Sequence, residues 1–178
     1  FKRKTNFHIL FRPILALGFM SIFSHSGYGY SKIICETTTS WFLNKYIPDK
    51  IENLEINHRG LKRDNSWGFC DTSPYNPKRE FKIELQSYMD KSQYMKVLLH
   101  ELIHVRQWVE GSLHYRCGGA MYYKDEDVGK TEYHNLPHEI EAFELEDIIY
   151  EEYLKETYDV TPDEVSFFCG KRFFSRYT

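Results

Sequence analysis

Hydrophobic and polar positions divide the chain into a few elements. Apolar residues recur at helical spacing over residues 31–46, and Pro48 ends that run, which predicts a helix. Apolar and polar residues alternate over residues 51–58 and again over residues 81–85, which predicts two strands that each have one polar face. Residues 59–80 are rich in glycine, proline and asparagine, and this composition is typical of a turn-rich connection.

Two longer helices are predicted in the second half. Asp90 and Gln93 have the spacing of an N-cap and its capping-box partner, and Gly111 is a typical C-terminal stop, so one helix lies between them. About 25 residues of loop follow, and loops of this length often form the wall of a site. Pro137 then begins a helix that extends to about residue 158. The predicted fold is a small α+β domain in which a short, mostly antiparallel sheet packs on the first of these helices.

The first long helix contains the motif His-Glu-x-x-His, formed by His100, Glu101 and His104. Residues i and i+4 lie about 40° apart around a helix, so both imidazoles leave the same face and can bind one tetrahedral zinc ion. The surrounding leucines, isoleucine and valines predict a buried helix, in which two histidines and a glutamate are costly without partners. A metal supplies such partners. Glu101 cannot reach the same ion, but it can act as general base for a water that the metal activates.

A catalytic zinc site takes three protein ligands, and the second helix offers candidates for the third. Glu139 shares a face with apolar residues at helical spacing, so its side chain is expected to point inward. Glu141 lies on a more mixed face, and His138 is the third candidate on this helix. His114 follows the helix-ending Gly111 and is a weaker candidate. The pattern alone leaves Glu139, Glu141 and His138 open.

These residues resemble the zincin-like metallopeptidases of phages and bacteria and, more distantly, the SprT-like proteins. In such proteins a Leu-Pro-x-Glu-x-Glu-Ala segment follows the histidine helix. The resemblance extends over about residues 50–155, and it departs from the usual pattern at His138, where a bulky aromatic residue is common. No C-terminal zinc ribbon of the SprT type is present in the sequence. The likeness rests on residues 100–107, Gly111, Tyr133 and residues 136–142.

The resemblance implies a zinc-dependent metallopeptidase that acts on a peptide or protein substrate. It implies that His100, His104 and Glu139 hold Zn²⁺ and that Glu101 is the general base. We expect a loop tyrosine, Tyr133 or one of its neighbours Tyr122 and Tyr123, to stabilise the transition state as an oxyanion donor. Two alternatives remain, a non-catalytic structural or assembly protein with a relic zincin site and an amidase acting on cell-wall peptides. Glu101 favours an enzyme, because zinc binding alone does not need it.

The strand predicted over residues 81–85 lies just before the metal-binding helix. We expect it to border the cleft, with a free edge on which an extended substrate can form main-chain hydrogen bonds. The alternative is an interior strand that is paired on both sides.

Residues 1–30 are predicted to be a region separate from the domain at 31–178. Basic residues precede an apolar run over residues 14–23, and Ser24-His25-Ser26-Gly27 follows, which is the layout of a secretory signal peptide. The run is too short for a transmembrane helix. The alternative is a retained apolar arm. A signal peptide would place the protein outside the cytoplasm, whereas a retained arm fits a phage- or cytoplasm-associated protein.

Charge and cysteine content argue against two other kinds of protein, a nucleic-acid-binding protein and a cysteine-only zinc ribbon. The net charge of −3 indicates no general attraction to nucleic acid. Four cysteines without a Cys-x-x-Cys pair argue against a cysteine-only zinc ribbon, and either two disulfides or four reduced thiols are compatible with them. Nothing in the sequence identifies a particular substrate or partner protein. The cysteines are Cys35, Cys70, Cys117 and Cys169.

Overall fold

The computed structural model describes residues 22–116 and 118–158, which form the α+β fold that the sequence predicts. Residues 1–21 of the predicted arm at 1–30, residues 159–178, which include Cys169, and Cys117 lie outside the described residues. Short 3₁₀ turns occur at Lys62–Asp64 and Tyr133–Asn135. The longer elements are β1 (Phe23–Gly27), α1 (Lys32–Tyr46), β2 (Asn53–Arg59), β3 (Gly68–Thr72), β4 (Glu80–Gln86), α2 (Lys91–Glu110), β5 (Leu113–Tyr115), β6 (Met121–Tyr123), β7 (Glu126–Asp127) and α3 (Pro137–Tyr158).

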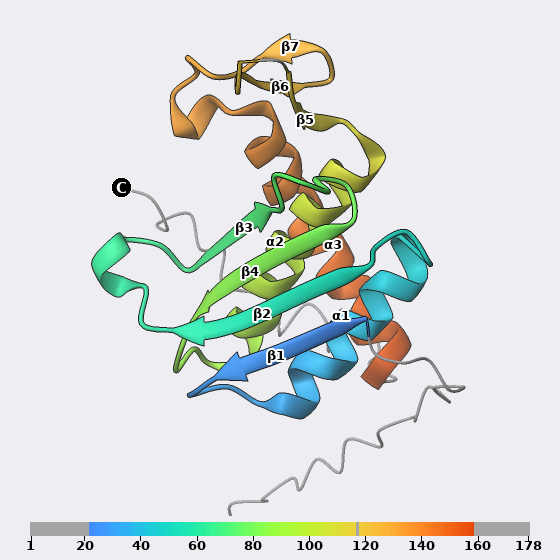
Figure 1. Ribbon diagram of the computed structural model, residues 1–178. Helices are drawn as coiled ribbons and strands as arrows, with labels where there is room; N and C mark the ends of the chain where they lie inside the picture. Colours follow the sequence, from blue (N-terminus) through green and yellow to red (C-terminus); the bar gives the residue numbers. More distant parts are fainter. Residues whose placement is uncertain (1–21, 117, 159–178) are drawn as a thin grey trace, which may run out of the picture.

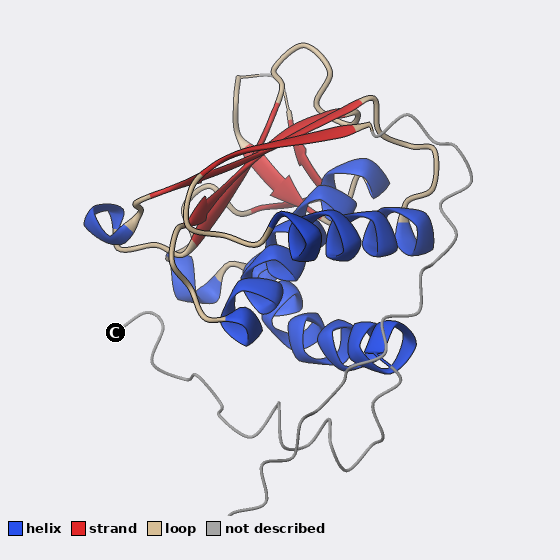
Figure 2. Ribbon diagram, turned by 90° about the horizontal axis from the view of Figure 1, so that it is seen from below, coloured by secondary structure: helices blue, strands red, loops and turns tan. Residues whose placement is uncertain are grey.

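The main sheet is mixed, with the strand order β1-β2-β4-β3, and the helices cover one of its faces (Figures 1 and 2). β2 pairs in parallel with both β1 and β4, and only β3 pairs antiparallel, with β4. The expectation of a mostly antiparallel sheet is therefore wrong for the two predicted strands, β2 and β4. The chain leaves β2, forms β3 at the edge and returns as β4 between them. Side-chain alternation has the same period in both orientations, so it cannot reveal this path.

β4 is an interior strand, so the expectation that residues 81–85 have a free edge is wrong. β2 is bonded to one side of β4 and β3 to the other. β3 is the outer strand at this end of the sheet, and it contacts α2. The edge that borders α2 therefore belongs to β3.

β1 lies in the segment that the sequence analysis assigns to the N-terminal arm. Phe23 pairs with Leu54 and Gly27 with His58, and the residues between them pair in the same register. The folded unit therefore includes residues on both sides of the predicted boundary at residue 31.

α2 is the central helix of the core and contacts α1, α3 and β3. Its ends agree with the prediction, because the Asp90 side chain accepts a hydrogen bond from the Gln93 N–H at 3.0 Å and Gly111 caps the helix in the left-handed conformation. The inward residues of the main sheet are buried against the helices, and each contributes about 1.5–3 kcal/mol of hydrophobic stabilisation. These inward residues include Leu54, Ile56, Phe81, Ile83 and Leu85.

The predicted long loop contains a second sheet, in which β6 pairs antiparallel with β5 and β7. Lys124 and Asp125 both have positive φ, the backbone conformation of a tight type I′ hairpin turn. Cys35 and Cys70 are free thiols. Within the described ranges, each helix is too short or too polar to span a bilayer.

Candidate metal centre

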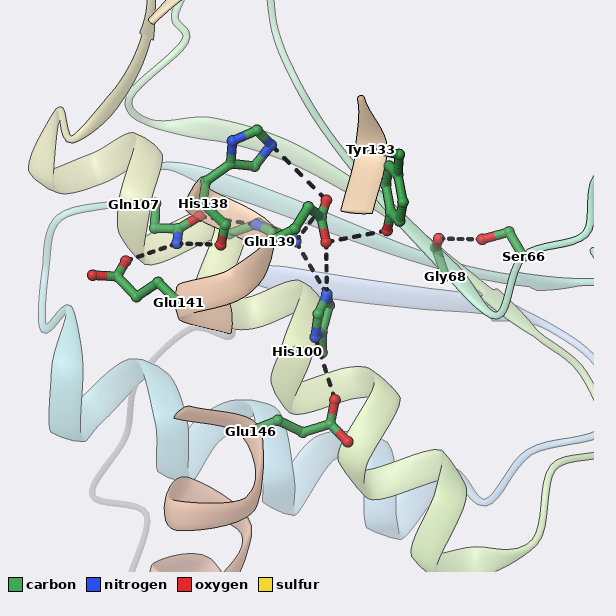
Figure 3. Close-up of polar contacts among 10 residues, drawn as sticks. Ser66, Gly68, His100, Gln107, Tyr133, His138, Glu139, Glu141 and Glu146 are labelled. Atoms are coloured by element: carbon green, nitrogen blue, oxygen red, sulfur yellow. Dashed lines mark hydrogen bonds and ion pairs between the residues drawn. The ribbon is translucent and has the colours of Figure 1, made fainter. Parts of the chain in front are cut away.

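Two helices bring together the predicted ligands His100, His104 and Glu139. The histidines lie on successive turns of α2, and Glu139 lies in the first turn of α3, which packs on α2. Their ligand atoms all lie within 4.8 Å of one another, and this buried group could hold a metal ion. Figure 3 shows the Glu139 carboxylate above the imidazole of His100.

The distances between the donor atoms fit a tetrahedral ion. His100 Nε2 lies 3.2 Å from His104 Nε2 and 3.3 Å from Glu139 Oε2, and His104 Nε2 lies 3.5 Å from Glu139 Oε1. An ion that binds N and O ligands at about 2.0–2.1 Å in tetrahedral geometry places them about 3.3–3.4 Å apart. These three distances, which involve both carboxylate oxygens of Glu139, are close to the spacing that one such ion requires.

The electrostatics of this group favour positive charge between the three side chains. Burial alone would raise the pKa of Glu139, but hydrogen bonds and charge from His100 and His104 hold it well below its usual value. Burial alone would lower the pKa of His100, but the carboxylates of Glu139 and Glu146 raise it to about 10. A bound cation can take the place of the proton that these groups otherwise share.

Each of the two candidate histidine ligands has a second side chain beside its Nδ1 atom. His104 Nδ1 donates to Gln107 Oε1 at 2.9 Å, and His100 Nδ1 lies 3.3 Å from Glu146 Oε2 on α3 (Figure 3). Such partners place the proton on Nδ1 and leave the lone pair of Nε2 directed at the metal position. Sequence reasoning missed both partners. Gln107 follows His104 by three residues and Glu146 follows Glu139 by seven, spacings that place each pair on one helix face.

Glu141, the second candidate for the third ligand, lies outside the donor group. Its Oε2 accepts from Gln107 Nε2 at 2.8 Å, and its Oε1 pairs with Lys124 at 3.0 Å. Gln107 Nε2 also donates to the His138 carbonyl at 3.0 Å. Glu141 therefore holds Gln107, which in turn orients His104.

The two histidine candidates also lie outside the donor group. His138 is buried beside it, with Nε2 3.9 Å from Glu139 Oε1. His114 lies on β5, where its Nδ1 donates to the Gly111 carbonyl at 3.1 Å. Of the four candidates considered in the sequence, Glu139 alone joins His100 and His104.

Glu101 is buried between α2 and the edge strand β3 and is not a member of the donor group. Burial raises the pKa of its carboxyl, although the positive charges of His100 and His104 oppose the shift. The free volume of the adjoining pocket is about 10 Å³, room for roughly one water molecule. The lining residues are Trp67, Gly68, Val97, His100, Glu101, Phe143 and Glu146.

Tyr133 is the loop tyrosine that reaches the donor group. Its hydroxyl donates to Glu139 Oε2 at 3.1 Å, and its side chain is exposed (Figure 3). Tyr122 instead stacks on His114, with ring centres 5.9 Å apart. Tyr123 is buried with its ring 6.0 Å from that of His138.

Comparisons with models of known protein families, with curated proteins and with solved structures find no match to this chain. The chemistry of the candidate metal centre is therefore the basis for proposing a function.

Proposed function

We propose that this protein is a zinc-dependent peptidase. The observation that carries the proposal is the pairing of a three-ligand group with a separate buried carboxylate, Glu101, beside it. Structural zinc sites are usually closed by four protein ligands, whereas catalytic sites have three. Two imidazoles and one carboxylate suit zinc among the common divalent metals. The resemblance to zincin-like metallopeptidases supports the same assignment.

The ion would be held by His100, His104 and Glu139. When bound, zinc acts as a Lewis acid that polarises a carbonyl group and makes water more acidic. Glu101 accepts a proton from the attacking water and returns it to the leaving amine. The raised pKa of Glu101 suits the first step, because a carboxyl with a raised pKa accepts the proton of the water more readily. Tyr133 is the proposed donor to the developing oxyanion.

An extended substrate would pair with the free edge of β3. Trp67 O and Ser73 N form ladder bonds with β4, at Gln86 N and Glu80 O respectively. Main-chain groups alternate in direction along an antiparallel strand, so those of Gly68, Cys70 and Thr72 face the open side. Main-chain hydrogen bonds of this kind hold a peptide beside the metal centre without demanding a particular sequence.

The proposal is tested on the purified full chain by metal analysis and by a peptide-cleavage screen with and without a chelator. We expect one zinc per chain and cleavage that the chelator abolishes. Glu101→Gln should retain zinc while hydrolysis falls about 10²–10⁴-fold. Glu110→Gln, the same change on the exposed end of α2, is the matched control and should cleave like the wild type.

Two results would contradict the proposal. A chain that binds zinc and cleaves no peptide would be a non-catalytic metal-binding protein. Equal cleavage by Glu101→Gln and the wild type would remove the role of general base from Glu101. Cleavage confined to cell-wall peptides would identify the amidase activity, which uses the same chemistry.

A further inference from the structure

Gly68, the first residue of the edge strand β3, lies directly against the side chain of Glu101. A Cβ atom built on Gly68 would overlap Glu101 Oε1 and would lie 2.9 Å from its Cδ and 3.0 Å from its Cγ. Carbon atoms that are not bonded to each other pack at about 3.5–4.0 Å. The carboxylate of Glu101 therefore occupies the space that any side chain at position 68 would need.

The backbone conformation at position 68 does not itself require glycine. Gly111, for example, has a positive φ, whereas Gly68 does not. Gly68 pairs with Leu85 as an ordinary strand residue. Glycine inside a strand weakens it, and it often marks a close approach by another group. Here the close approach is that of Glu101.

The backbone around Gly68 is held on both sides. The Trp67 carbonyl accepts from the Gln86 N–H at 2.9 Å, and the Gly68 carbonyl accepts from Ser66 Oγ at 2.7 Å (Figure 3). The atoms that a side chain at position 68 would meet belong instead to the flexible end of Glu101. An added methyl group would therefore displace the carboxylate more readily than the strand.

We propose that Gly68 is a positioning residue, whose missing side chain lets the carboxylate of Glu101 rest against the backbone of the edge strand beside the metal centre. The catalytic consequence rests on the proposed peptidase function, because it assumes that Glu101 is the general base. The contact itself does not depend on that function. The two parts are therefore tested separately.

The contact is tested by a thermal double-mutant cycle on the full chain, with wild type, Gly68→Ala, Glu101→Ala and the double variant. Gly68→Ala should lower the Tm of the wild type by about 2–4 °C, the shift expected for roughly 1 kcal/mol in a chain of this size. In the Glu101→Ala background the clash is absent, so Gly68→Ala should leave the Tm unchanged or raise it, because alanine restricts the unfolded chain.

Gly60→Ala is the matched control, because a Cβ there meets only Tyr28 Oη at 3.9 Å, an ordinary contact. Its effect on the Tm should be the same in both backgrounds. An equal loss of Tm from Gly68→Ala with and without the Glu101 side chain would overturn the proposal. If Gly68→Ala does not fold, folding of the double variant supports the contact, and failure of both overturns it.

The positioning role is tested by kinetics and zinc content. Gly68→Ala should retain one zinc and a similar KM while kcat falls about 10–100-fold, because a shift of about 1 Å in a catalytic group has effects of that order. Glu101→Asp shortens the side chain by one methylene, so it should restore part of kcat in the Gly68→Ala background and lower kcat in the wild type. Unchanged kcat in Gly68→Ala would refute the role. If wild type cleaves nothing, the peptidase proposal fails, while the thermal cycle still decides the contact.

Discussion

His58 and His100 are both buried histidines, yet their surroundings shift their pKa values in opposite directions. His58 lies on β2, where its Nδ1 donates to the Ser26 carbonyl at 2.8 Å and its Nε2 accepts from the Tyr94 hydroxyl at 3.0 Å. The ring of Tyr30 stacks on it with centres 3.4 Å apart. Burial lowers the pKa of His58, since these neighbours are neutral and the nearby His25 further disfavours positive charge.

Around His100 the same burial is outweighed by carboxylates. Glu139 and Glu146 lie at opposite nitrogens of its ring, 3.3 Å away in each case, and raise its pKa to about 10. Both nitrogens of His58 contact neutral groups, whereas the Nε2 atoms of His100 and His104 lie close together beside the carboxylate of Glu139. Burial alone therefore does not mark a candidate ligand. Convergent donor atoms and charged partners do.

The largest expected effect is loss of zinc when a proposed ligand histidine is replaced. Replacing His58 should not remove zinc. His100→Ala or His104→Ala should abolish tight zinc binding and remove the gain in Tm that zinc gives, because a ligand that binds only the native state stabilises it. His58→Phe should retain one zinc per chain. Metal analysis after dialysis and thermal unfolding with added zinc provide the measurement, and loss of zinc from His58→Phe would break the distinction.

A smaller effect is expected at Glu146, which lies beside His100 without belonging to the donor group. Glu146→Ala should weaken zinc binding about 10–100-fold, as is typical for the partner of a ligand histidine. Asp147→Asn, at the next position of α3, pairs with Lys96 and is the control that should bind zinc normally. Competition titration with a chelating dye measures both. Equal affinities would show that Glu146 does not support His100.

A still smaller effect is expected at Glu141. Glu141→Ala removes one partner of Gln107 but leaves the bond of that side chain to the His138 carbonyl, so zinc affinity should fall less than about tenfold. Glu139→Ala should instead lose tight binding. Zinc titration of the two variants compares them directly, and the reverse order would make Glu141 the third ligand.

The smallest effect concerns the pH dependence of stability. Folding lowers the pKa of His58, so the unfolded chain binds more protons than the folded one at low pH. The contribution of neutral His58 to stability is therefore fully present above about pH 6.5 and is lost as the pH falls. In metal-free protein, the free energy of unfolding should therefore fall less steeply for His58→Phe than for the wild type between about pH 6.5 and 5. The two slopes should differ by less than about 1.4 kcal/mol per pH unit. Urea unfolding at several pH values measures the difference. Parallel declines would mean that His58 does not titrate differently on folding.

The sequence by itself determined the local features of this protein. The spacing of His100 and His104 placed both imidazoles on one helix face, and Asp90, Gly111 and Pro137 marked helix ends that the structure confirms. The alternation in β2 and β4 correctly predicted their buried faces. These features depend on residues within a few positions of one another, so the chain encodes them directly.

Only the tertiary structure decided which distant segments meet. It paired β2 and β4 in parallel, made β3 the edge and added β1 to the sheet. Each of these strand pairings depends on long-range contacts that side-chain alternation does not specify.

The candidate metal centre also combines features that the sequence determines with features that only the tertiary structure decides. Glu139, Glu141 and His138 lie within one turn of α3, and the way this helix packs on α2 decides which of them meets His100. The same packing brings Glu146 to the far side of His100, and the path of β3 brings Gly68 against Glu101. Helical spacing specifies which residues share a face, but only the docking of one element on another specifies what that face meets.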